Sequence, residues 1–326
     1  MYKLAKPLFI YSQSPMHVGS GSDLGLVDLP IQRESHTGFP KIEASSLKGA
    51  IRENFEGKAA KDDDWYDIQL AFGFDKDSLP SGVESRFPKN EDRDYSGALA
   101  FSDARLLLFP VKSFKGIFAY VTCPQVLERF RNDLQICESA SSNDKIKALL
   151  DVFANNAIPK ENKMASVADL TSSSKIILED YAFEVKEDDQ ATKDFAKELG
   201  THLAIDLTKR LVVLSDNVFA DFVKLFTEVI TRNKIDNSKG TVAKGALFTE
   251  EYLPAESVLY SLVFANSIFT AKENRKGSFK KNGDNDKIAE EQKVQNYFTA
   301  KIAEKNGIMQ IGGNSTLGKG IVKTKF

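Results

Sequence analysis

Six charged or titratable side chains crowd into one glycine-rich stretch near the start of the chain. They are His17, Asp23, Asp28, Arg33, Glu34 and His36. Glycines at positions 19, 21 and 25 allow tight turns, so the backbone there can approach a ligand closely. Carboxylate and imidazole groups are suited to acid–base chemistry and to binding cations. Taken alone, the stretch indicates either a functional loop or a surface loop that leads into an amphipathic helix.

The helix expected directly after this loop has a composition suited to binding phosphate. Ser45 and Ser46 stand at its start, and Lys48 and Arg52 follow with the spacing that places them on one face. Hydroxyl groups and free backbone N–H groups at a helix N-terminus bind anions, and a nearby lysine adds positive charge. These four residues are therefore candidate contacts to a nucleic-acid backbone.

A second glycine-rich loop lies near the end of the sequence, where residues 313–319 read GNSTLGK. This pattern matches the G-x-x-x-x-G-K core of a nucleotide-binding phosphate loop. An ATPase is excluded, because Gly320 stands where a hydroxyl residue should hold magnesium, and because the last seven residues are expected to form a strand instead of a helix. The loop is interpreted either as a close approach to an RNA backbone, with Lys319 as a point charge, or as a tight turn.

Composition places the chain among ordinary globular proteins. Its 326 residues include 42% hydrophobic and 28% charged residues, and 23 phenylalanines can supply a large core. Two cysteines without a CxxC pair exclude a disulfide framework and a cysteine-rich zinc module, and they fit a reducing cytosol, so a cytoplasmic protein is expected. The N-terminal MYKLAKPLFIYSQS is interpreted as a first strand, not a signal peptide, and no membrane helix is expected.

Charge is segregated along the chain although the net charge is only −2. Residues 272–281 carry five basic side chains and one acid, and residues 319–326 carry three lysines and no acid. Residues 61–64 and 187–189 are acidic. Basic stretches of this kind can follow a phosphate backbone on a nearly neutral protein. Charge alone, however, favours the simpler interpretation of solvated loops.

The elements that must position these residues alternate irregularly between strands and helices. Strands are predicted at 4–12, 97–101, 105–109, 114–122, 175–185, 208–214, 256–264 and 319–325, and helices at 45–56, 124–135, 216–228 and 286–305. Residues 229–235 and 241–248 are predicted to form a β-hairpin with its turn at 236–240. Because several strands follow one another directly, the pattern favours an α+β fold with an antiparallel sheet. The polar stretches 57–96 and 139–173 are interpreted as insertions or mobile loops.

Four ordered blocks of sequence resemble the RAMP superfamily of CRISPR proteins. The blocks are HVGSGSDLGLVDLPIQRESHTGFPKIEASSLKGAIR (17–52), SGALAFSDARLLLFPV (96–111), KGALFTEEYLP (244–254) and GGNSTLGKG (312–320). Within that superfamily they are most similar to the multi-copy backbone subunits of type III-B (Cmr) effector complexes. The resemblance implies one RAMP domain over residues 1–326, with a ferredoxin-like, RRM-like core, large insertions and a projecting thumb hairpin at 228–254.

The resemblance also implies an endoribonuclease that acts within an assembled complex. The family's catalytic aspartate falls at Asp28, and Asp23 is ranked below it. Three further catalytic candidates are implied. His17 matches a loop histidine of the family, and Glu250 and Tyr252 match an acid and a tyrosine at the base of the thumb, for which a chemical role and a bracing role are both left open. The implied cofactor is Mg²⁺ or Mn²⁺, weakly held, with Asp28 as its ligand, because the sequence shows no cluster of carboxylates.

The implied partners are a guide CRISPR RNA, a complementary target RNA, adjacent copies of the same chain and other RAMP subunits. Contacts to the guide backbone are expected at Ser45, Ser46, Lys48, Arg52, Gly313 and Lys319. Leu247 and Phe248 are candidates for an apolar wedge that splays the target nucleotide to be cut. A core-facing position in the strand is the alternative for these two residues.

Three other functions are compatible with parts of this pattern. A backbone subunit that binds guide RNA without cutting is the main alternative, and Asp28 argues against it. A RAMP endonuclease that matures guide precursors acts as a single copy and lacks a thumb, so one cut in a precursor, instead of a ladder of target fragments, would identify it. A small-molecule enzyme is disfavoured by the failed phosphate-loop match.

Overall fold

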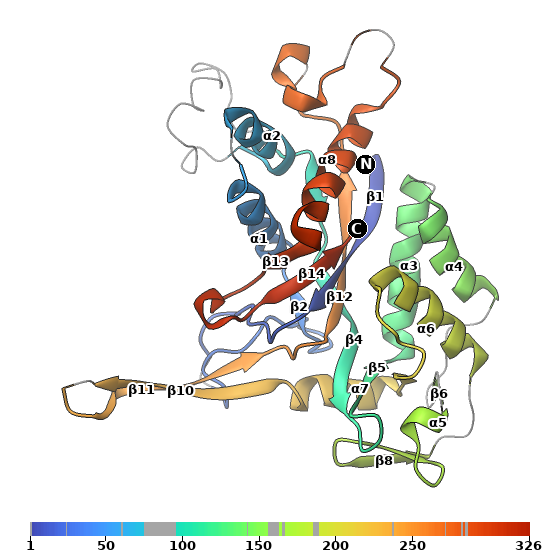
Figure 1. Cartoon of the computed structure of the whole chain (residues 1–326), viewed down its shortest axis with the longest axis vertical. Coiled ribbons are helices and arrows are strands. Elements are labelled where there is room, and N and C mark those ends of the chain that lie inside the picture. Colours follow the sequence, from blue (N-terminus) through green and yellow to red (C-terminus); the bar gives the residue numbers. More distant parts are fainter. Residues whose placement is uncertain are drawn as a thin grey trace.

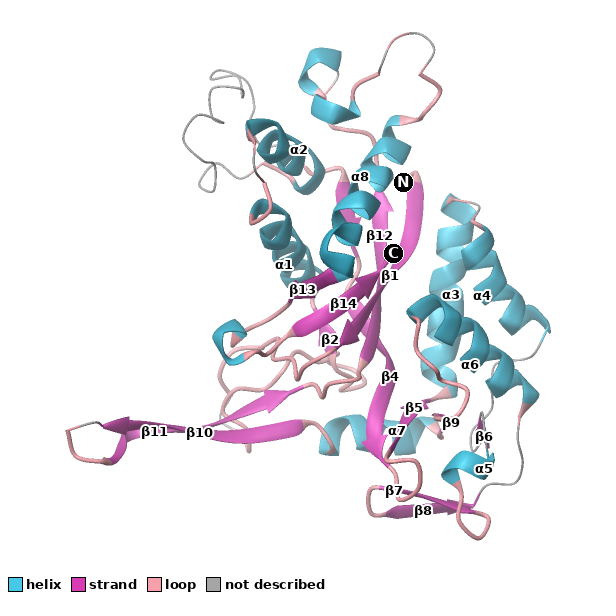
Figure 2. Ribbon diagram, in the orientation of Figure 1, coloured by secondary structure: helices cyan, strands magenta, loops and turns pink. Residues whose placement is uncertain are grey.

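A central sheet with helices on both faces forms the body of the molecule, and a long hairpin extends from one end of it (Figures 1 and 2). The computed structural model describes residues 2–23, 25–59, 61–74, 96–141, 143–155, 163–164, 167–184, 189–236, 238–270, 272–281, 283 and 286–326. Among these residues, no helix is long and apolar enough to cross a membrane.

The described strands number fourteen. They are β1 (Leu4–Ser12), β2 (Lys41–Ile42), β3 (Leu99–Phe101), β4 (Ala104–Lys112), β5 (Phe118–Thr122), β6 (Lys163–Met164), β7 (Lys175–Leu178), β8 (Tyr181–Glu184), β9 (Leu211–Val213), β10 (Glu228–Asp236), β11 (Thr241–Tyr252), β12 (Val258–Ala265), β13 (Ile308–Gln310) and β14 (Ile321–Lys325). Ten of them form one sheet in the order β13-β14-β1-β12-β4-β5-β9-β6, with β2 paired to β4 and β3 paired to β12.

The described α-helices lie on both faces of this sheet. They are α1 (Ala44–Glu56), α2 (Asp62–Phe72), α3 (Pro124–Ala140), α4 (Asp144–Asn155), α5 (Val167–Leu170), α6 (Gln190–Leu203), α7 (Asp216–Leu225) and α8 (Glu290–Ala303). Helices α1, α2 and α8 lie on one side, and α3, α4 and α6 lie on the other (Figure 1). The mixed α+β architecture predicted from the sequence is confirmed.

Four antiparallel strands form the centre of the sheet in the order β14-β1-β12-β4. Helix α1 connects β1 to the β4 side, and α8 connects β12 to β14. This connectivity is the β-α-β-β-α-β arrangement of ferredoxin-like units. Aromatic rings join the two helices, because Phe55 of α1 lies 5.8 Å from Phe298 of α8 between ring centroids. The two crossing helices therefore share one core, in which both phenylalanines are fully buried.

Several element predictions need correction. Within 57–96 and 139–173, the described residues contain α2 and α4, so the mobile-loop interpretation does not hold for those parts. Ile146, Leu149 and Phe153 are buried at helical spacing on α4, a signal that the polar residues around them obscured. The single strand predicted at 175–185 is a hairpin of β7 and β8 that turns at Glu179, whose φ of 50° is left-handed.

The predicted β-hairpin is present and consists of β10 and β11. The two strands pair in antiparallel register from Glu228 opposite Tyr252 to Asp236 opposite Thr241. A register shift between Asn233 and Ile235 marks a bulge in the ladder. The hairpin makes a two-stranded sheet of its own and projects away from the central sheet (Figure 2). Its base, not its tip, lies beside the glycine-rich loop near the N-terminus.

Candidate nucleic-acid interface

The loop that follows β1 is fixed to the base of the hairpin by backbone hydrogen bonds. Met16 and Leu253 exchange two such bonds, of 2.9 and 2.8 Å. Further along the loop, the Leu29 N–H donates to the Thr249 carbonyl (3.1 Å), and the Glu251 N–H donates to the Leu29 carbonyl (3.0 Å). The loop therefore adds a short extra strand to the edge of β11. Two segments more than 200 residues apart in the sequence are thus held in one fixed arrangement.

Asp28 lies at this junction with its side chain exposed to solvent. Its Oδ2 accepts hydrogen bonds from the Thr249 backbone N–H (2.7 Å) and from the Thr249 hydroxyl (2.9 Å). These two bonds, the backbone bond first, hold the pKa of Asp28 below its usual value. No described residue donates to Oδ1. Asp28 is therefore an ionised and oriented carboxylate with one oxygen open to solvent.

Asp23 is also exposed, and its N–H donates to the Asp28 carbonyl (2.9 Å). This backbone hydrogen bond closes the loop formed by residues 23–28, so the two acids lie at the two ends of one short loop. In the part of the chain that the structure describes, no group of three His, Cys, Asp or Glu residues is placed to hold a metal ion. Any cation at Asp28 must take most of its ligands from water or from a bound substrate.

Glu250 and Tyr252, the other acid and the tyrosine predicted for the site, face the opposite side of β11 from Thr249, because side chains alternate along a strand. The buried Glu250 carboxylate accepts hydrogen bonds from the Tyr252 hydroxyl (2.6 Å), Arg232 Nη1 (2.8 Å) and Asn314 Nδ2 (2.8 Å). Burial raises the pKa of Glu250, but these hydrogen bonds outweigh it, and the net shift is downward. Glu250 is therefore a buried acid whose carboxylate is hydrogen-bonded within the protein.

Tyr252 has the same character. It is 1% exposed, and its pKa is raised by burial and by its bond to Glu250. Asn314 and Arg232 also donate to its hydroxyl oxygen, at 3.0 and 3.2 Å. The arrangement joins both strands of the hairpin to the C-terminal glycine-rich loop. It leaves neither Glu250 nor Tyr252 exposed on the side where Asp28 lies.

His17 lies on the Tyr252 side, with its ring 5.5 Å from the tyrosine ring between centroids. Its Nδ1 donates to the Glu251 carbonyl oxygen (2.6 Å), which can only accept. This bond places a proton on Nδ1 and fixes the orientation of the ring. The His17 carbonyl in turn accepts the Gly313 N–H (2.9 Å). His17 therefore connects the N-terminal loop, the hairpin base and the C-terminal loop.

Glu251 of β11 anchors the N-terminal loop that carries Asp28. Its carboxylate forms an ion pair with Arg33 and accepts hydrogen bonds from the Thr227 hydroxyl (2.6 Å) and the Ile31 N–H (3.0 Å). Glu251 is 5% exposed, so this pair is largely removed from solvent. Removing one partner of such a pair leaves a buried charge unpaired, which costs more than the pair contributes. The pair therefore fixes the path of the loop that carries Asp28.

The C-terminal glycine-rich loop makes a tight turn against the N-terminal loop. Gly312 has a φ of 87°, and a Cβ there would lie 2.3 Å from the His17 carbonyl oxygen, so only glycine fits. The Gly313 N–H is used by His17 and is not available to a phosphate. Lys319 Nζ lies over the Tyr252 ring, 4.9 Å from its centroid. Residues 315–318 remain exposed at the tip of the turn.

Both predicted phosphate-binding cations of helix α1 make contacts within the protein. Lys48 is half-buried, its Nζ donates to the Leu99 carbonyl (3.2 Å), and burial lowers its pKa. Arg52 donates to Glu56 (2.6 Å), to the Gly73 carbonyl (3.2 Å) and to Gln69 (3.1 Å). The charged groups of Lys48 and Arg52 therefore both contact groups of the protein itself. The sequence spacing predicted their shared face correctly but not the helix α2 and the strand that cover it.

The start of α1 is also partly occupied. The Ala44 N–H donates to Asp103 Oδ1 (2.9 Å), so a protein carboxylate already takes the place of an anion there. The Ser46 hydroxyl accepts a hydrogen bond from Gln32 (3.1 Å). Ser45 is exposed. Of the four residues predicted on this helix, Ser45 is the one whose position best suits contact with a ligand.

The two wedge candidates lie on opposite faces of the hairpin. Leu247 is 64% exposed and occupies the same face as Thr249, two residues away on β11. Phe248 is half-buried and pairs in register with Arg232, on the face of Glu250 and Tyr252. Leu247 is therefore not a core-facing residue, and it lies on the Asp28 side. Phe248 lies on the opposite face of the hairpin, together with Glu250 and Tyr252.

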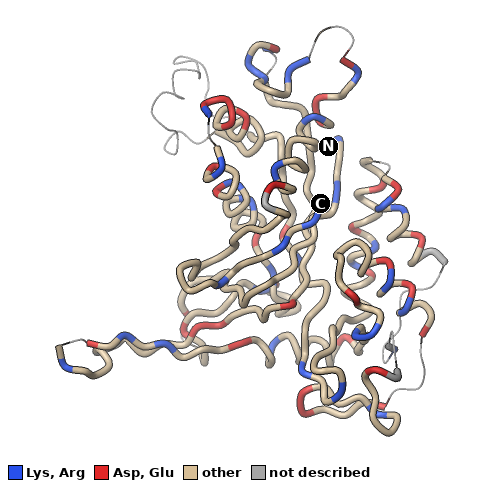
Figure 3. The backbone as a smooth tube through the Cα atoms, viewed as in Figure 1, with Lys and Arg blue, Asp and Glu red and all other residues tan. Residues whose placement is uncertain are grey.

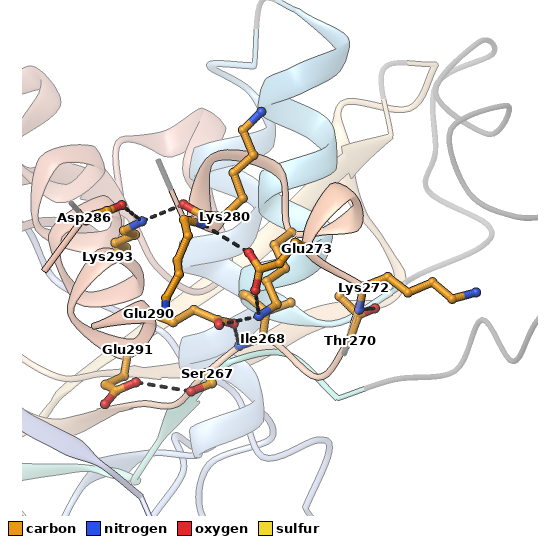
Figure 4. A network of polar contacts seen from close by, with 12 residues as sticks. Ser267, Ile268, Thr270, Lys272, Glu273, Lys280, Asp286, Glu290, Glu291 and Lys293 are labelled. Carbon is orange, nitrogen blue, oxygen red and sulfur yellow. Dashed lines mark hydrogen bonds and ion pairs between the residues drawn. The ribbon is translucent and has the colours of Figure 1, made fainter. Parts of the chain in front are cut away.

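Charge is distributed over the whole surface, with Lys and Arg interspersed among Asp and Glu (Figure 3). The basic stretch 272–281 lies far from the hairpin (Figure 1), and its Lys276 is paired with acids. Lys276 contacts Glu273 and Glu290, each at 2.7 Å. Lys293 contacts Asp286 (2.5 Å) within the same network (Figure 4). This finding agrees with the simpler interpretation of that stretch.

The sequence analysis did not assign Thr249, Asn314 or Arg232. Thr249 orients Asp28, and the other two complete the hydrogen bonds of Glu250 and Tyr252. Thr249 lies inside the block KGALFTEEYLP, and strand alternation places it on the face opposite Glu250 and Tyr252. That alternation is the signal that separates the two faces. No pattern in the sequence indicates that Asn314 reaches the hairpin base.

The antiparallel core, its two crossing helices and the projecting hairpin define a ferredoxin-like α+β protein with a long hairpin insertion. A profile of the RAMP superfamily matches residues 9–323, so the chain belongs to that superfamily. Within it, the chain is 35% identical over 319 residues to the CRISPR system Cmr endoribonuclease Cmr4 of Pyrococcus furiosus. The match covers 96% of this chain and 92% of that relative, which places the chain in the Cmr4 family.

Solved structures agree with this placement. The crystal structure of oligomeric Cmr4 from Pyrococcus furiosus has a TM-score of 0.65 and 28% identity, covering 98% of this chain and 96% of that one. A chain of the type III-B Cmr-beta complex bound to cognate target RNA has a TM-score of 0.72, covering 99% and 97%. At 23% identity, the second likeness supports the fold alone.

Proposed function

We propose that this chain is a backbone subunit of a type III-B effector complex, in which copies stack along a guide CRISPR RNA and cut the paired target RNA. The observation that carries the proposal is the exposed Asp28 carboxylate, held by Thr249 at the foot of a projecting hairpin. Membership of the Cmr4 family supports it, because the Pyrococcus furiosus relative is named an endoribonuclease. We place the complex in the cytoplasm, beside other RAMP subunits.

Asp28 is proposed to act as an ionised ligand more than as a strong base. The hydrogen bonds from Thr249 keep its pKa low, so the carboxylate stays charged but accepts a proton weakly. A single open oxygen fits a cation that keeps most of its water and takes further ligands from RNA phosphate oxygens. When bound there, Mg²⁺ or Mn²⁺ would supply positive charge beside the phosphate being cut.

The hairpin is proposed to be the thumb that positions the target strand. Leu247 is exposed on the face that carries Thr249, so it can insert beside a base and splay one nucleotide next to Asp28. In RNA, a splayed nucleotide lets the 2′-hydroxyl align behind its own phosphorus, and such positioning removes much of the barrier to cleavage. A hairpin that projects this far from the body can reach an adjacent copy (Figure 1).

Glu250, Tyr252 and His17 are proposed to position the thumb without contacting the reacting atoms. The Glu250 carboxylate accepts three hydrogen bonds on the far face of β11, and the Tyr252 hydroxyl is buried with it. His17 fixes the loop through its bonds to Glu251 and Gly313. Guide contacts are proposed at Ser45, Lys319 and the exposed tip of the C-terminal loop.

The direct test is cleavage of a labelled complementary RNA by the assembled complex, with and without EDTA. A ladder of evenly spaced fragments that disappears with EDTA and returns with Mg²⁺ or Mn²⁺ supports the proposal. Binding of target without any fragments indicates a purely structural subunit. A single cut in a guide precursor indicates a processing enzyme instead. Fragments that persist in EDTA would contradict the cation's role but not the cutting itself.

A further inference from the structure

A separate pocket of about 360 Å³ is lined by residues of α4 and α6. These two helices lie away from the hairpin (Figure 1). Strand β1, helices α4 and α6 and the end of β14 line it. Its walls are mainly apolar and include the aromatic rings of Phe9, His202 and Phe326. Asn143 and Thr201 add an amide and a hydroxyl. Pockets of this size and composition, with a few polar groups among apolar ones, are typical of small-ligand sites.

Three lysines, Lys6, Lys145 and Lys325, also line the pocket. None of them takes part in any ion pair among the described residues. Lys6 Nζ lies over the Phe326 ring, 4.5 Å from its centroid. Burial, and then the charge of Lys145, lower the pKa of Lys6. Burial, followed by the charges of Lys145 and Lys323, lowers the pKa of Lys325. Lys145 therefore repels both Lys6 and Lys325.

Two acids line the same pocket, and neither neutralises the lysines. Glu198 is directed to His202, whose Nδ1 lies 3.4 Å from its carboxylate and 3.1 Å from its carbonyl oxygen. Asp144 is exposed at the start of α4 and is not ion-paired to any of the three lysines in the described structure. The pocket thus combines aromatic residues with three lysines that are not ion-paired to either of its acids in the described structure. An anion that carries a flat body is the ligand that matches both features.

We propose that this pocket binds a nucleotide, with its phosphate near Lys6, Lys145 and Lys325 and its base against the aromatic walls. Asn143 Oδ1 already accepts the Lys145 N–H (2.9 Å), and the Thr201 hydroxyl already donates to the Lys197 carbonyl (2.9 Å). The Asn143 Nδ2 donor and the Thr201 oxygen as acceptor are the groups that a base edge can use and that an alkyl chain cannot. The nucleotide is either a free nucleoside monophosphate or the phosphorylated end of an RNA strand. The inference does not depend on Asp28, because the pocket and the hairpin base share no residues.

Calorimetric titration of the full-length chain with AMP and UMP tests the proposal. Saturable binding is expected, weakened about tenfold by Lys145→Glu, because a phosphate contact is lost and repulsion is added. Lys147→Glu is the matched control, since Lys147 is exposed on the same helix but does not line the pocket. Ala148→Phe, which fills the pocket without changing its charge, is expected to abolish binding. Thermal unfolding of each variant checks that it is folded.

Further probes separate the possible outcomes. A 5′-phosphorylated trinucleotide that competes with AMP and binds more tightly identifies an RNA end as the ligand, whereas failure to compete identifies a free nucleotide. Equal binding of inorganic phosphate would overturn the proposal, because it would indicate a general anion site. Three further results would overturn the proposal. They are stronger binding of dodecanoate than of AMP, a loss of affinity in Lys147→Glu equal to that in Lys145→Glu, and no binding of AMP and UMP at about 10 mM.

Discussion

Two carboxylates on the two sides of one strand, Asp28 and Glu250, illustrate how position decides what an acid can do. Asp28 is exposed, receives two hydrogen bonds on one oxygen and keeps the other open. Glu250 is buried and receives hydrogen bonds from Tyr252, Arg232 and Asn314. The pKa of each is lowered, so ionisation alone does not distinguish them. Access to solvent does, and it is the reason why we propose cutting at one face of β11 and bracing at the other.

The largest effect is expected from removing the exposed carboxylate. Asp28→Ala should lower the single-turnover rate of target cleavage on the order of 1000-fold, because the ionised ligand at the scissile phosphate is lost. Binding of guide and target should be unchanged. Asp23→Ala is the control, since Asp23 is exposed in the same loop, and its rate should stay within about threefold of wild type. A larger loss in the Asp23 variant would move the site to that residue.

The buried acid should affect stability, with a dependence on pH. Glu250→Gln should destabilise the protein by about 1–3 kcal/mol, because Arg232 loses its charged partner and one acceptor becomes a donor. Since the folded pKa of Glu250 lies below its ordinary value of 4.5, its contribution is fully present above pH 4.5 and is lost as pH falls through the folded pKa. Melting temperatures of both proteins should differ at pH 7 and converge near pH 3. A gap that widens on acidification would contradict this role.

The orienting hydroxyl should have a smaller effect. Thr249→Val keeps the shape and the backbone N–H but removes two hydrogen bonds, the one that the hydroxyl donates to Asp28 Oδ2 and the one that it accepts from the Asp28 N–H. Cleavage should slow about tenfold, chiefly through the lost hydrogen bond to the charged carboxylate, and target binding should be unchanged. Thr231→Val is a matched control, because Thr231 pairs directly with Thr249 on β10. If both variants cut equally well, Thr249 does not position Asp28.

The smallest effect is expected on helix α1. Lys48→Met should change guide-RNA affinity by less than about twofold and leave its salt dependence unaltered, because the Lys48 ammonium contacts the Leu99 carbonyl instead of solvent. Ser45→Glu places a negative charge at an exposed position of the same helix and should weaken binding more strongly at low salt. A steeper loss for the lysine variant would restore the phosphate contact predicted from sequence spacing.

Local signals in the sequence predicted much of the fold. The turn residues at 236–240 indicated the hairpin, and the helix predicted at 216–228 corresponds to α7, which Ser215 caps by accepting the Val218 N–H (3.5 Å). Helix α6 was not predicted, although it has the buried apolar spacing of Phe195 and Leu199. The polar residues of α6, like those around α4, obscured the helical spacing of its apolar residues. Local propensity therefore located caps and turns better than it located amphipathic helices.

Only part of the candidate site could be predicted from the sequence, and the reason is physical. The resemblance pointed to Asp28, and the structure places it at an exposed junction. What the sequence did not reveal are contacts made across long separations, such as Asp28 with Thr249 and Glu250 with Asn314. The same limit explains Lys48 and Arg52, because the residues that cover them come from α2 and β3. Helical spacing predicts which side chains share a face but not what that face contacts.

One pair of variants tests the division between the two faces most directly. Asp28→Asn and Glu250→Gln each replace a carboxylate by its amide, and both are assembled into the complex for measurement of cleavage rate and melting temperature. Asp28→Asn should lose cutting and keep its melting temperature, whereas Glu250→Gln should melt at a lower temperature and keep most of its cutting well below that transition. Wild-type cutting by Asp28→Asn, or a stable Glu250→Gln complex that no longer cuts, would contradict the assignment.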